Sequence, residues 1–99
     1  MKSNFINIKG KTYKLNYFDD NRDYLGLTDV KQKTIEIYKH QDFESLKLTI
    51  THELLHAYLF ECGLVSFCGN EIIVNWFENI YFELYENLEQ LLFLKAKKT

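Results

Sequence analysis

Residues 52–56 read His-Glu-Leu-Leu-His, and this H-E-x-x-H arrangement is the part of the sequence whose residue types and spacing can do chemistry. Side chains four residues apart lie one above the other on a helix, so His52 and His56 can approach one ion together. Glu53 is rotated by about 100° from His52 and can reach the open side of that ion. Imidazole nitrogens with an open fourth position are typical of catalytic zinc. The spacing therefore predicts a Zn²⁺ site on a helix, with Glu53 as a general base.

A third protein ligand is needed, because two histidines alone make a poor zinc site. We choose Glu71, which stands at the start of a second predicted helix, where an antiparallel return of the chain would bring it near His56. Asn75 lies four residues later on the same helix face, where its amide could hydrogen-bond a ligating imidazole and fix its tautomer. Other candidates for the third ligand stay open at this point: Glu78, Glu61, Cys62, Cys68 and His40.

The elements that must position these residues begin with a small sheet. Residues 5–8 and 12–17 are rich in strand formers and flank Gly10, which indicates a hairpin turn. Residues 25–30 and 33–38 form two more predicted strands. In the last of these, Ile35 and Ile37 alternate with polar side chains, so one face of the strand is buried. The first half of the chain is thus a small, mostly antiparallel sheet.

Two long helices complete the predicted fold. Asp42 is a suitable N-cap, and apolar residues recur at helical spacing behind it until Gly63, a natural stop. A loop over residues 66–70 leads to a second amphipathic helix over residues 72–94, which ends in a lysine-rich tail. The fold class is therefore α+β, a sheet followed by two helices that carry the zinc site.

Composition limits what this chain can be. Its 99 residues suit one domain spanning 1–99, and 46% apolar with 16% aromatic residues excludes a disordered chain. Twelve basic against fourteen acidic residues give a net charge of −2, which argues against nucleic acid as a partner. No apolar run is long enough to span a membrane, and two cysteines are too few for a disulfide scaffold. We expect no membrane association and a cytoplasmic location.

The pair of motifs, residues 52–56 and then Glu71 with Asn75 four positions on, resembles the gluzincin pattern of zinc metallopeptidases. Small size and the strand just before the first motif resemble the compact ImmA/IrrE-like proteins of phages and mobile elements, and the minigluzincins. The resemblance covers about residues 25–92. It implies a minimal zincin with His52, His56 and Glu71 as zinc ligands. Asn75 replaces the aspartate common in larger gluzincins, and no residue matches their oxyanion stabiliser.

Two functions follow from this resemblance. One is a metallopeptidase that cuts a narrow protein or peptide target, or is held autoinhibited by a terminal segment. The other is a weakly active or inactive zinc-stabilised binding module of phage or mobile-element origin. Tyrosines could donate to an oxyanion, but none is assigned.

The second predicted helix also holds more large aromatics than one face can bury, which indicates a homodimer or a partner surface. These aromatics are Trp76, Phe77, Tyr81, Phe82 and Tyr85, and the four candidate tyrosine donors are Tyr38, Tyr58, Tyr81 and Tyr85.

Overall fold

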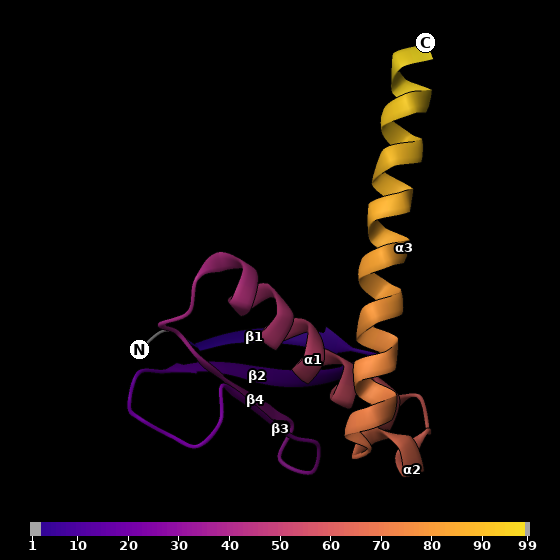
Figure 1. Ribbon diagram of the computed structural model, residues 1–99. Coiled ribbons are helices and arrows are strands. Elements are labelled where there is room, and N and C mark those ends of the chain that lie inside the picture. The colour runs from indigo at the N-terminus through magenta and orange to yellow at the C-terminus, as the bar shows by residue number, and fades with distance from the viewer. Residues whose placement is uncertain (1–2, 99) are drawn as a thin grey trace.

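A computed structural model describes residues 3–98, with side chains over 4–93, and has the predicted α+β fold (Figure 1). Four strands come first and three helices follow. The strands are β1 (Ser3–Ile8), β2 (Lys11–Phe18), β3 (Gly26–Asp29) and β4 (Thr34–Tyr38). The helices are α1 (Phe43–Glu61), the short α2 (Val65–Cys68) and α3 (Glu71–Lys98).

The sheet has the strand order β1-β2-β4-β3, and two of its three pairings are antiparallel, as predicted. The β1–β2 hairpin turns at Lys9 and Gly10, whose φ angles of 53° and 86° are both positive, as a tight two-residue hairpin turn requires. The third pairing, between β2 and β4, is parallel and was not predicted. This pairing leaves β3 at one edge of the sheet, in contact with α1.

The loop between β2 and β3 reverses the chain and is held by one arginine. The Arg22 guanidinium lies 4.1 Å from the centre of the Phe18 ring and donates hydrogen bonds to Asp20 Oδ2 at 2.9 Å and Glu36 Oε2 at 3.1 Å. These contacts join the loop to β2 and β4 at once. They fix the point at which β3 enters the sheet.

Helix α1 covers one face of the sheet and completes the core. Its N-cap is Asp42, whose Oδ1 accepts a hydrogen bond from the Ser45 amide at 2.8 Å, as the sequence predicts. Buried side chains from β1, β2, β4 and α1 form the core, and three partly buried α1 residues pack against it. The buried set is Ile8, Tyr13, Ile35, Ile37 and Ala57, and the partly buried α1 residues are Leu46, Ile50 and Leu54. This packing sets the rotation of α1 about its axis and hence where the motif side chains point.

The connection from α1 to α3 is tighter than predicted. Gly63 ends α1 with a φ of 85°, but part of the expected loop over residues 66–70 is the single helical turn α2. From there α3 crosses α1 and runs on well beyond the rest of the molecule (Figure 1). The radius of gyration is accordingly 15.4 Å, above the roughly 13 Å typical of a compact chain of this length. None of the helices in residues 3–98 combines the length and apolar character of a membrane span.

A three-residue ion cluster fastens the end of α1 to the sheet. Glu61 Oε2 accepts hydrogen bonds from the Tyr13 hydroxyl and from Lys33 Nζ, both at 2.6 Å. A carboxylate is unfavourable at a helix C-terminus, and Lys33 offsets that charge. The Lys33 ammonium, followed by the Tyr13 hydroxyl, lowers the pKa of Glu61. Burial and the hydrogen bond to Glu61 raise the pKa of Tyr13 well above its usual range.

The lowered pKa of Glu61 therefore predicts that the free energy of unfolding decreases in acid. Because the folded pKa of Glu61 is depressed, its contribution is present above about pH 4.5, the ordinary pKa, and is lost as pH falls through the lower folded pKa. We expect the urea midpoint of the chelator-treated chain to decrease from about pH 6 to about pH 3, and to decrease less in Glu61→Gln. Glu44→Gln, on an exposed α1 side chain, is the control. Equal pH slopes in wild type and Glu61→Gln would contradict this assignment.

Candidate metal centre

The two motif histidines point toward one place beside α1. His52 and His56 are one turn apart, their side chains are 20% and 13% exposed, and their Nε2 atoms lie 3.3 Å from each other. The core stripe of α1 faces the sheet, so the histidines, on a neighbouring face of the helix, turn toward α2 and α3. Both imidazoles therefore offer the same nitrogen to the same point.

Glu71 completes the cluster, as predicted. It is the first residue of α3, and its Oε2 lies 2.8 Å from His52 Nε2 while its Oε1 lies 3.0 Å from His56 Nε2. The start of α3 is fixed by Asn70, whose Oδ1 accepts hydrogen bonds from the Ile72 and Ile73 amides. His52, His56 and Glu71 form a His-His-Glu group that could hold a metal ion.

The spacing of these atoms fits a small tetrahedral ion. With metal–ligand bonds of about 2.0–2.1 Å, tetrahedral ligand atoms lie about 3.3 Å apart. The two histidine Nε2 atoms lie 3.3 Å apart, close to that value, and they lie 2.8 and 3.0 Å from the two different oxygens of Glu71. The two imidazole nitrogens and the carboxylate therefore meet at one place, where a proton or a cation can lie between them. A cation at their centre satisfies all three groups.

A backbone carbonyl selects the tautomer of His56. Its Nδ1 donates a hydrogen bond to the Cys68 carbonyl oxygen at the end of α2. With the proton on Nδ1, the Nε2 lone pair is free for a metal. The α2 turn, which the sequence analysis missed, thus has a direct role in the site.

Glu78, and not Asn75, for which we predicted a hydrogen bond to a ligating imidazole, lies beside a motif histidine. Glu78 Oε1 lies 3.4 Å from His52 Nδ1, its side chain is only 16% exposed, and this buried oxygen has no hydrogen-bond partner among the described residues. Asn75 is exposed, and the hydrogen bonds found within residues 4–93 include none from its amide to a histidine. The carboxylate therefore lies behind the imidazole, on the side where metal-ligating histidines commonly meet a carboxylate.

The remaining candidate ligands lie elsewhere or are otherwise engaged. Glu61 is bound to Lys33, the Cys68 thiol donates to the Val65 carbonyl at 3.2 Å, and both Cys62 and His40 are exposed. None of these side chains belongs to the metal-binding group found among the described residues. Glu71 is the third member of that group.

Glu53 is buried beside the cluster and held by β3. It is 7% exposed, and the Thr28 hydroxyl lies 2.7 Å from its Oε1 and 3.0 Å from its carbonyl oxygen. Together with both histidines and Glu71, it lines a cleft of about 410 Å³ whose far wall is Gly26, Leu27 and Thr28 of β3. A buried carboxylate and a group that could hold a metal ion therefore line one cleft beside β3, at the edge of the sheet.

Comparisons with known proteins leave the resemblance as a prediction. No family model matches the chain, and neither curated proteins nor solved structures gave a match.

Gly26 makes room for Glu53, which predicts a sharp effect of a single methyl group. A Cβ at Gly26 would lie 2.8 Å from Glu53 Cγ and 2.9 Å from Thr49 Cγ2. We expect Gly26→Ala to lower the free energy of unfolding by about 1–3 kcal/mol in urea titrations. Gly69→Ala is the matched control, because Gly69 lines the same cleft and a Cβ there meets nothing within 4 Å. Equal effects of the two substitutions would refute this close packing.

Glu78 and Asn75 give a second prediction. We expect Glu78→Gln to weaken metal affinity by about 10- to 100-fold, because the carboxylate behind His52 is lost. Asn75→Ala should leave the affinity unchanged. Competition titration with a chromophoric chelator measures both. A larger loss of metal affinity in Asn75→Ala than in Glu78→Gln would show that Asn75, and not Glu78, supports the histidine.

Proposed function

We propose that this protein is a zinc-dependent metallopeptidase with His52, His56 and Glu71 as ligands and Glu53 as general base. The observation that supports it is the position of Glu53, a buried carboxylate that lines the same cleft as the His-His-Glu group. Two imidazoles and one carboxylate with an open side are the donor set of catalytic zinc. A purely structural site commonly has four protein ligands and does not need a carboxylate that stays outside the ligand set.

Glu53 and Thr28 then have distinct roles beside the bound metal. When bound, zinc lowers the pKa of water to about 7 and polarises a carbonyl group. Glu53 accepts the proton of the attacking water and later passes it to the leaving amine. Thr28 holds the Glu53 carboxylate in place through its hydroxyl. The partly buried setting limits competing water and strengthens these interactions.

The β3 edge is the proposed place for the substrate. β3 is at an edge of the sheet, where it pairs with β4 alone among the described strands, and Gly26, Leu27 and Thr28 of β3 line the cleft. An extended peptide can add to such an edge through backbone hydrogen bonds. A cleft of this size encloses few side chains, which favours a narrow protein target. Cys62 and Cys68 are free thiols, in keeping with a cytoplasmic location.

A second candidate is a zinc-stabilised binding module of phage or mobile-element origin. The observation that favours it is the lining of the cleft, which includes none of the four tyrosines considered as oxyanion donors among the described residues. Such a donor contributes about 10²–10³-fold to rate in known hydrolases. The two candidates make opposite predictions for Glu53.

Glu53→Gln separates them. In a metallopeptidase we expect this variant to keep stoichiometric zinc and to lose hydrolysis by at least about 10²-fold, because the base is gone and the ligands remain. His56→Ala and Glu71→Ala should lose zinc as well. Zinc is measured by elemental mass spectrometry, and cleavage by mass spectrometry of a peptide library.

Two outcomes would decide against the proposal. Wild-type protein purified without chelators and lacking zinc would overturn the metal site. Zinc-loaded wild type with no more cleavage than Glu53→Gln would overturn the peptidase and support the binding module.

A further inference from the structure

A second hollow continues the cleft of the metal centre on the other side of Glu53. We define this space, of about 340 Å³, as the Glu78 hollow. Three residues, Gly26, His52 and Glu53, line both the hollow and the cleft of about 410 Å³. The proposed base therefore stands between two adjoining spaces. A peptide bond held at Glu53 would place a neighbouring substrate side chain in the hollow, so the remaining lining residues decide which side chain is accepted.

The wall of the Glu78 hollow is largely apolar. Leu25 precedes β3 and Leu48 lies on α1, and these two residues are 51% and 46% exposed. Thr49 contributes its methyl group beside Gly26, because its hydroxyl donates a hydrogen bond to Gln41 Oε1 at 2.8 Å. A wall of this kind packs against the carbon stem of a long substrate side chain.

Glu78 brings to the hollow a carboxylate without a hydrogen-bond donor among the described residues. Its side chain is 16% exposed, and its buried Oε1 lies 3.4 Å from His52 Nδ1 without a hydrogen bond. The other oxygen, Oε2, has no hydrogen bond or ion pair with any residue in the described part of the chain. A largely buried carboxylate without a donor is unfavourable, so a donor from a bound ligand would be stabilising.

The charges around the hollow favour a cationic donor. Its lining contains the carboxylates of Glu53 and Glu78 and, among the described residues, no lysine or arginine. Lys47, which is nearby on α1, is paired with Glu44 at 3.6 Å. A divalent ion would be balanced by Glu71 and Glu53, so Glu78 leaves one negative charge in excess. An acidic substrate side chain would be repelled, whereas an ammonium or guanidinium group would form a charge-assisted hydrogen bond.

We propose that the Glu78 hollow selects substrates with a lysine or arginine next to the scissile peptide bond. Leu25 and Leu48 contact the aliphatic stem of that residue, and Glu78 accepts hydrogen bonds from its cationic end. The proposal names the substrate class of the metallopeptidase proposed above and rests on that function.

Peptide pools that differ in one side chain test this specificity. Three decapeptide pools carry lysine, norleucine or glutamate at the sixth position and are randomised elsewhere without lysine or arginine. Norleucine keeps the stem of lysine and lacks the ammonium group. We expect zinc-loaded wild type to cleave next to the sixth residue at least about 10-fold faster in the lysine pool than in the norleucine pool, because a charge-assisted hydrogen bond is lost. The glutamate pool should be cleaved most slowly.

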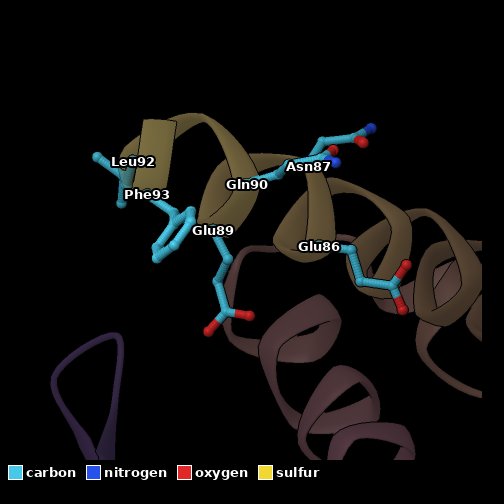
Figure 2. A pocket seen from close by; sticks show the side chains of 6 residues that line it. All are labelled: Glu86, Asn87, Glu89, Gln90, Leu92 and Phe93. Carbon is cyan, nitrogen blue, oxygen red and sulfur yellow. The ribbon is translucent and has the colours of Figure 1, made fainter. Parts of the chain in front are cut away.

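A charge placed in the wall of the hollow should remove the preference for lysine. Leu48→Lys brings an ammonium group beside Glu78, whereas the neutral Leu48→Gln should keep the preference. Leu92→Lys is the control for net charge. Leu92 lines a separate hollow at the far end of α3, which is formed by α3 residues alone (Figure 2) and lies about 21 Å along the helix from Glu78. Circular dichroism and zinc content show that each variant keeps its folded site.

Binding separates this proposal from the peptidase itself. If no pool is cleaved, fluorescence anisotropy of the labelled pools should still show at least about 10-fold tighter binding of the lysine pool, which would support the hollow without the peptidase. Cleavage with equal rates for lysine and norleucine would overturn the hollow's role and leave the peptidase intact. An equal loss of preference in Leu48→Lys and Leu92→Lys would also overturn it. A wild type that neither cleaves nor binds any pool at about 1 mM would overturn both.

Discussion

The contact between the Glu71 carboxylate and the two imidazole Nε2 atoms is the constraint to which the rest of the structure is adjusted. Groups that offer lone pairs to one point repel one another unless a proton or a cation lies between them. The fold keeps them together through two devices. The core packing of α1 fixes the direction of both histidines, and the α2 turn brings the start of α3 back to them.

This arrangement has a second layer of support outside the ligands. The Cys68 carbonyl accepts a hydrogen bond from His56 Nδ1, and the Glu78 carboxylate lies 3.4 Å from His52 Nδ1. The Thr28 hydroxyl donates to Glu53 from the opposite side of the cleft. A site whose side chains are each held by a neighbour loses little conformational entropy when a ligand binds.

Much of this was predictable because local chemistry decides it. The hairpin at Gly10, the cap at Asp42 and the end of α1 near Gly63 each follow from backbone preferences of single residues, and the motif spacing places His52 and His56 on one helix face. The parallel pairing of β2 with β4 depends on long-range packing, which strand periodicity does not reveal. α2 has four residues, which are too few to show a helical periodicity in the sequence. The choice of Glu78 over Asn75 depends on how α3 crosses α1, and helix spacing alone does not specify that.

The sequence separations within the cleft have a consequence for folding. His52 and Glu71 are 19 residues apart, so closing the metal centre costs little chain entropy and needs only the continuous stretch from α1 to α3. The Thr28–Glu53 contact, by contrast, joins the sheet to the helix. The group that could hold a metal is thus local in the sequence, whereas the position of the proposed base depends on the whole tertiary structure. A partly folded chain that retains this helical stretch would keep the His-His-Glu group together before Glu53 reaches its place against β3.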